Sequence, residues 1–151
     1  MPSIVIADTS CLILLDKIDG FQILQEVYDE IITTPEIKKE FGKFLPEWIK
    51  IESVKDTKYQ KFIETQLDKG ESSAIALASE KVDVTLILDD LKARKIANRL
   101  GFKVTGTLGV INKAKEIGVI KKIRPYIEKL QKTDFRISEN IIENLLKRNN
   151  E

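Results

Sequence analysis

The chain has 151 residues, with no histidine and one cysteine. A chain of this length with 42% hydrophobic residues can bury a core of its own, so we expect a single domain over residues 1–151. Without an imidazole, the serine and cysteine triads and ordinary zinc sites are excluded. The 25 Lys and Arg residues nearly balance the 24 Asp and Glu residues, so a phosphate-binding surface would have to come from local clustering.

The first residues do not form a secretory signal, because no Lys or Arg precedes the apolar run and Asp8 interrupts it. No uninterrupted apolar segment reaches the length of a membrane span. Cys11 lies in an apolar segment and is expected to be a small buried residue. These features predict a soluble, cytoplasmic protein.

Short apolar runs alternate with helical patterns along the whole chain. Apolar runs bounded by polar or turn residues predict strands, and apolar positions three or four apart predict helices. The expected strands are residues 4–7, 28–33, 48–54, 84–88 and 103–105; the expected helices are residues 11–15, 21–27, 35–41, 56–67, 70–78, 91–100, 121–130 and 138–147, with another helix opening at 106–109. This alternation is typical of an α/β fold with a mostly parallel sheet.

Acidic residues occur where predicted strands end and where helices face inward. Asp8 follows the first strand, and Asp89 and Asp90 follow the strand at 84–88. Glu40 flanks the apolar stripe of its helix, and Glu71 begins a helix rich in small residues, on its packing face. Because the carboxyl ends of parallel strands meet at one sheet edge, we expect these acids to converge. Two simpler explanations stay open: Asp8 as a helix cap, and Glu71 as an exposed first-turn acid that complements the helix dipole.

Two helices carry apolar stripes that we expect to face the core. The stripes are Ile37, Phe41 and Phe44 in and after the helix at 35–41, and Ala93, Ile96, Ala97 and Leu100 in the helix at 91–100. The second helix also has a basic arc, formed by Lys92, Lys95 and Arg99. This arc is either a solvated face or, if it borders the acids, a surface that holds a phosphate backbone. Arg94 projects from a different arc, where it could pair with a carboxylate.

A cluster of carboxylates repels itself and therefore needs a cation. Oxygen ligands without nitrogen or sulfur favour Mg²⁺ or Mn²⁺. One or two such ions activate water and stabilise the attacking and leaving oxygens when a phosphodiester is hydrolysed. This chemistry needs no histidine.

The same residues occur in the order and spacing of a known family. Asp8-Thr9-Ser10, the Thr34-Pro35 helix start that leads to Glu40, Glu71 at a small-residue helix, and Asp89 after an apolar strand resemble the PIN-domain nucleases over residues 3–117. The likeness is greatest to prokaryotic toxins of the VapC-like type. Within that type it points to a branch with the Leu88-Asp89-Asp90 and Gly106-Thr107-Leu108-Gly109 patterns.

The resemblance implies a three-layer α/β/α fold with a five-stranded sheet, to which residues 118–151 add C-terminal helices. It also implies a divalent-metal endoribonuclease that holds Mg²⁺ or Mn²⁺ through Asp8, Glu40, Glu71 and Asp89. Ser10 would assist at the metal or at the substrate phosphate. An RNA substrate, a small antitoxin partner and a homodimer are expectations from the resemblance alone.

The chain departs from the family pattern in one place. Family nucleases commonly place a second acid or Asn a little beyond the third acid, whereas here Asp89 and Asp90 are adjacent. We favour Asp89 as the ligand because it directly ends the strand, and keep Asp90 as a second catalytic candidate. Thr107 either adds a hydroxyl to the cleft as a substrate-binding residue or caps its helix.

Three other functions compete with this hypothesis. The first is a PIN-like module that has lost turnover and serves as a nucleic-acid-binding or scaffold protein. A phospho-receiver domain would place its acidic pair after the first strand, but the pair here follows residues 84–88. A haloacid-dehalogenase-type phosphatase needs an Asp two residues after Asp8, where Ser10 stands. We therefore predict a metal-dependent ribonuclease, the toxin of a toxin–antitoxin pair.

Overall fold

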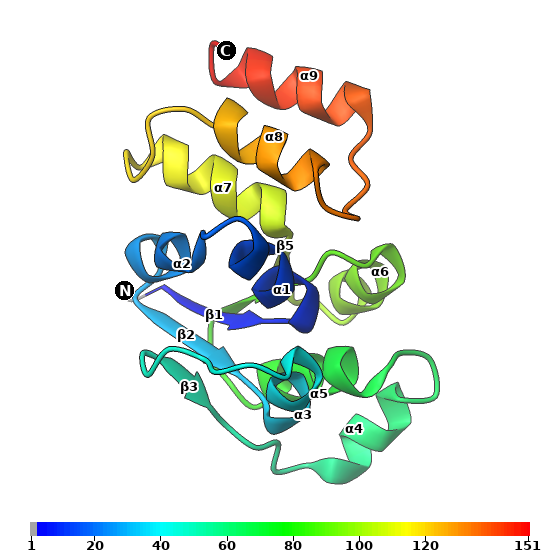
Figure 1. Ribbon diagram of the computed structural model, residues 1–151. Coiled ribbons are helices and arrows are strands. Elements are labelled where there is room, and N and C mark those ends of the chain that lie inside the picture. The colour runs from blue at the N-terminus through cyan, green and yellow to red at the C-terminus, as the bar shows by residue number, and fades with distance from the viewer. Residues whose placement is uncertain (1–2) are drawn as a thin grey trace.

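The computed structural model describes residues 3–151 (Figure 1). Its elements in chain order are β1 (Ile4–Ala7), α1 (Thr9–Lys17), α2 (Phe21–Val27), β2 (Glu30–Thr33), α3 (Pro35–Phe41), β3 (Ile49–Ile51), α4 (Thr57–Ile63), α5 (Lys69–Ser79), β4 (Val84–Ile87), α6 (Leu91–Arg99), β5 (Lys103–Thr105), α7 (Thr107–Glu116), α8 (Arg124–Gln131) and α9 (Glu139–Arg148). Within the described residues no helix is long and apolar enough to span a bilayer.

All five strands run parallel, in the order β3-β2-β1-β4-β5, so β1 occupies the centre of the sheet. A parallel sheet is covered on both faces, and its strands therefore read as continuous apolar runs. In β1, Val5, Ile6 and Ala7 are buried, and in β4, Leu86 and Ile87 are buried. The predicted α/β class and mostly parallel sheet are confirmed.

Helices cover both faces of the sheet, which gives the expected three layers (Figure 1). α1, α2 and α7 lie on one side, and α3, α4 and α5 lie on the other. α2 packs on α7, and α5 packs on α3 and α4. α8 and α9 then stack outward from α7, so the C-terminal helices extend the first of these layers (Figure 1).

Several predicted boundaries shift by a few residues. The strand predicted at 28–33 begins only at Glu30, because Tyr28 is the C-cap of α2. The strand predicted at 48–54 shrinks to Ile49–Ile51 at the sheet edge, where it has one neighbour. The helix predicted at 56–67 ends at Ile63. Local patterns locate such elements well but fix their ends poorly.

Two residues expected to face the core are exposed. Phe44 is 100% exposed, because α3 ends at Gly42 in the left-handed conformation (φ 72°) and the apolar stripe cannot continue past it. Leu100 is 47% exposed, because it is the C-cap of α6 and lies outside its helical face. The other expected core positions of these two helices pack in or against the core.

The side chain of Glu151 fastens the C-terminal segment to α7 and α8. Its carboxylate accepts hydrogen bonds from Lys115 Nζ at 2.7 Å and from the backbone N–H groups of Ile123 and Arg124 at 2.9 and 3.2 Å. Its side chain is only 6% exposed. Burial alone would raise the pKa of this carboxyl, but these hydrogen bonds and the Lys115 charge outweigh it and lower the pKa to about 2.

A pH-dependent loss of stability follows for Glu151→Gln. A carboxyl whose folded-state pKa lies below its unfolded value stabilises the fold above the unfolded pKa, and this contribution is lost as the pH falls through the folded pKa. At pH 7 the variant should have a free energy of unfolding lower by roughly 1–3 kcal/mol. Urea titrations should show this deficit shrinking as the pH is lowered from 7 toward 3. A deficit that does not change with pH would contradict the assignment.

Candidate active site

The carboxylate of Asp8 is buried directly after the central strand. The residue is 4% exposed, and its Oδ1 has no hydrogen-bond partner among the residues that the structure describes. Asp8 occupies the N-cap position of α1, yet its side chain makes no capping hydrogen bond. The alternative explanation, in which the Asp8 side chain caps α1, is therefore wrong. An unpartnered buried carboxylate oxygen is costly and calls for a partner outside the chain.

Asp89 is held by two hydroxyl groups and a backbone amide. Ser10 Oγ and Thr107 Oγ1 donate to its Oδ2 at 2.8 and 2.6 Å, and Thr107 N–H donates to Oδ1 at 2.8 Å. The N-cap of α7 is Gly106 rather than Thr107, and Thr107 is fully buried. The structure thus decides against the capping alternative for Thr107: its hydroxyl faces the acid.

Glu40 reaches the same region from the last turn of α3. Its Oε1 accepts a hydrogen bond from Thr9 Oγ1 at 2.6 Å, although the residue as a whole is exposed. The carboxylate lies against Gly70 of α5, where an added Cβ would overlap it. The small residue at this position therefore makes room for Glu40.

Glu71 lies in the first turn of α5, beside a second acid that the sequence analysis missed. That acid is Asp68, the N-cap of α5, whose Oδ1 accepts from Glu71 N–H at 2.8 Å. Burial first, and then the charges of Asp68 and Asp90, raise the pKa of Glu71 to about 7. Glu71 is partly buried, so the explanation as a freely solvated first-turn acid does not hold.

These acids line one pocket of about 570 Å³ at the carboxyl edge of the sheet. Its walls are Asp8, Thr9, Ser10, Ile13, Glu40, Asp68, Glu71, Asp89, Asp90 and Phe135. The five acids predicted from the sequence therefore do converge on one pocket.

The pocket also changes the acidity of Asp8. Burial, and then the charges of neighbouring acids, raise the pKa of Asp8 to about 8.

The pocket contains no ready-made ligand set. In the part of the chain that the structure describes, no three acidic side chains already stand as a group that could hold a metal ion. Hydroxyl groups hold Glu40 and Asp89 in place instead, and Asp90 uses Oδ2 to cap α6 through Ala93 N–H at 2.9 Å.

A comparison with family models gives a match to DUF3368, a PIN domain, over residues 4–151. The chain belongs to this PIN-domain family. The match includes the C-terminal helices, which lie beyond the residues 3–117 that carried the resemblance in sequence. Comparison with curated proteins and with solved structures gave no match. Membership of the family points to a nuclease and supports the PIN fold.

The predicted basic arc of the PIN domain lies on the exposed surface of α6. Lys92, Lys95 and Arg99 are exposed on α6, and none of them lines the acidic pocket. Arg94 is the basic residue of α6 that approaches the site. Its Nη1 donates to the backbone oxygen of Leu88 at 3.2 Å, so the expected pairing with a carboxylate is replaced by a bond to a carbonyl.

Two pocket residues were missed by sequence reasoning. Asp68 had a local signal, because it stands three residues before Glu71 at a helix start, as in a capping pattern. Phe135 had none, since it comes from the loop between α8 and α9 and reaches the pocket only through tertiary packing.

Gly70→Ala should lower nuclease activity without destabilising the fold. Alanine in a helix is more stable than glycine by up to about 1 kcal/mol, but its Cβ must push the Glu40 carboxylate away from Thr9. We expect the rate of nucleic-acid cleavage to fall about tenfold while thermal stability is kept or raised.

Glu40→Gln provides the control for this prediction. If the effect passes through Glu40, Gly70→Ala should cost little further activity in the Glu40→Gln background. Fully additive losses in the double variant would show that Gly70 acts on something else.

Proposed function

We propose that this PIN domain is a divalent-metal-dependent endoribonuclease that hydrolyses RNA phosphodiester bonds. One observation carries the proposal. Among the described residues, Asp8 Oδ1 is buried without a hydrogen-bond partner, in a pocket that five further acids also line. A protein gains nothing from such repulsion in its own fold, so the arrangement fits a bound cation.

The residues present fit Mg²⁺ or Mn²⁺. The pocket offers carboxylate oxygens and hydroxyls and no nitrogen or sulfur ligand from a side chain, which suits hard cations. Asp8, Glu40, Glu71 and Asp89 would hold the metal, with Asp68 as an additional charge at its edge. A bound ion of this kind would activate water and neutralise the charge that develops on a phosphoryl group.

Other side chains of the site have positioning tasks. Thr9 orients Glu40, and Ser10 and Thr107 orient Asp89, each through a hydroxyl that donates to the carboxylate. Hydroxyls held in this way preorganise the acids before metal or substrate arrives. The titratable side chains that line the pocket are all carboxyls, so one of them would serve as the general base.

The biological setting proposed here is that of a toxin with a small antitoxin partner, acting as a homodimer. What supports it is the ordered set of motifs that resembles the VapC-like toxins. The competing function, a PIN domain without turnover that binds nucleic acid, differs in a measurable way: it would bind RNA and leave it intact.

Cleavage of single-stranded RNA by the parent chain and by two neighbouring variants tests the proposal. Asp89→Asn should lower the rate at least about 100-fold with Mg²⁺ or Mn²⁺, because it removes a ligand charge. Asp90→Asn should cost less than about tenfold, because Asn caps α6 as well as Asp does. EDTA should stop cleavage by the parent.

Three outcomes would overturn parts of this account. Uncut RNA in the parent reaction with both metals would favour the inactive module. Full activity of Asp89→Asn would remove the assigned site. A larger loss of cleavage rate in Asp90→Asn than in Asp89→Asn would show that Asp90, and not Asp89, is the metal ligand.

A further inference from the structure

A groove of about 700 Å³ continues from the acidic pocket along the sheet edge formed by β5. The two share Asp89 and Phe135, which line both. The lining residues of the groove come from α6, β5, the start of α7, the loop at 132–138 and α9. The groove and the acidic pocket therefore adjoin at Asp89 and Phe135.

Three of the five arginines of the chain line this groove: Arg94, Arg136 and Arg148. They come from α6, the 132–138 loop and the last turn of α9, so the fold gathers them from separate segments. None of the three forms a salt bridge with a residue in 3–151. Asp89, at the junction, is the only acid among the lining residues. The groove therefore presents guanidinium groups that carry no salt bridge within residues 3–151, and guanidinium groups bind phosphate well.

The remaining lining is mostly apolar and includes one aromatic ring at the junction. Phe135 stands where the acidic pocket meets the groove, and it packs partly against the core. Aliphatic side chains, among them Val104, Leu108 and Ile137, line the groove beyond it. Unstacked bases pack on such surfaces and stack on aromatic rings, whereas the backbone phosphates need cations nearby.

We propose that this groove holds the single-stranded RNA as it leaves the acidic site. Arg136 and Arg148 contact backbone phosphates, Arg94 contacts the phosphate nearest the acids, and a base next to the cleaved bond stacks on Phe135. The inference rests on the proposed ribonuclease function. It places the strand over the C-terminal segment and not over the α6 arc of Lys92, Lys95 and Arg99.

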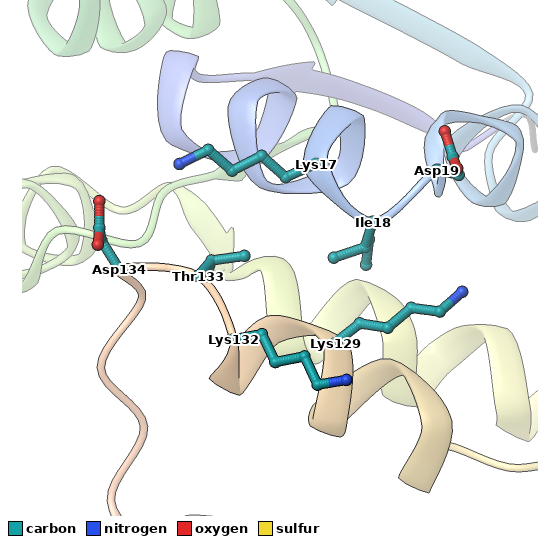
Figure 2. Close-up of a pocket in the computed structure, with 7 residues that line it drawn as sticks. All are labelled: Lys17, Ile18, Asp19, Lys129, Lys132, Thr133 and Asp134. Atoms are coloured by element: carbon teal, nitrogen blue, oxygen red, sulfur yellow. The ribbon is translucent and has the colours of Figure 1, made fainter.

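A matched pair of double variants tests the groove. Arg136→Ala with Arg148→Ala removes two charges from the groove, and Lys132→Ala with Lys147→Ala removes two nearby charges outside it. Figure 2 shows Lys132 at the end of α8, where it lines a separate pocket with Lys17 and Lys129. Lys147 is exposed on α9, directly before Arg148, and does not line the groove.

Binding of a fluorescein-labelled oligouridine is measured by anisotropy in EDTA at several salt concentrations. The arginine variant should bind at least about tenfold more weakly than the parent, and its salt slope should fall by about 1.4, because each phosphate contact on a single strand contributes about 0.7. The lysine variant should keep the parent's affinity and slope. Arg136→Lys with Arg148→Lys should restore most of the slope.

Phe135→Leu tests the stacking contact separately, because leucine keeps apolar volume and removes the ring. Binding should weaken roughly 5- to 100-fold with no change in salt slope. In cleavage assays with Mg²⁺, the arginine variant should raise KM and leave kcat within about twofold, since its charges lie outside the acidic pocket.

The results that would contradict the groove proposal can be told apart from those that would contradict the ribonuclease proposal. If the parent cleaves RNA and the arginine variant binds and cleaves it equally well, the groove is not the strand's path and the ribonuclease proposal stands. If Lys92→Ala with Lys95→Ala lowers the slope instead, the strand lies over α6. If the parent neither binds nor cleaves RNA, both proposals fall together.

Discussion

A carboxylate buried at the end of the central strand is the constraint on which the rest of the site depends. Asp8 lies deeper than any other acid of the pocket, and no donor within residues 3–151 reaches its Oδ1. Burial of an unpaired charge costs several kcal/mol, and the raised pKa of Asp8 is the expression of that cost. The surrounding acids raise it further. The cation proposed to bind here would offset this cost.

The parallel sheet explains how acids that lie far apart in sequence come to surround Asp8. β1 and β4 are neighbours in register, with Ala7 opposite Ile87, so the residues that follow both strands emerge at the same edge. α3 and α5 then bring Glu40 and Glu71 from the other layer, and Gly70 permits their close approach. Hydroxyl groups hold two of the acids, Glu40 and Asp89, in fixed positions.

The sequence predicts the parts of this arrangement that local patterns encode. Strands β1 and β4 with their terminal acids, the Thr34-Pro35 helix start and the small face of α5 are all visible in short windows. The exposed Phe44 was placed wrongly because the apolar spacing was extended past the predicted helix end, where Gly42 takes the left-handed conformation and ends the helical face. The groove with Phe135 could not be foreseen either, since its walls meet only after α8 and α9 pack on α7.

Calorimetric titration of Mn²⁺ and Mg²⁺ into the parent chain and into Asp8→Asn tests the central claim most directly. Run at pH 7 in two buffers that differ in ionisation enthalpy, it reports both the affinity and the protons released on binding. The account predicts that the parent binds the ion and releases protons, because burial keeps carboxyls of the pocket protonated near neutral pH. It predicts that Asp8→Asn loses this binding. Equal affinity and equal proton release in the two proteins would show that the buried carboxylate of Asp8 does not hold the metal.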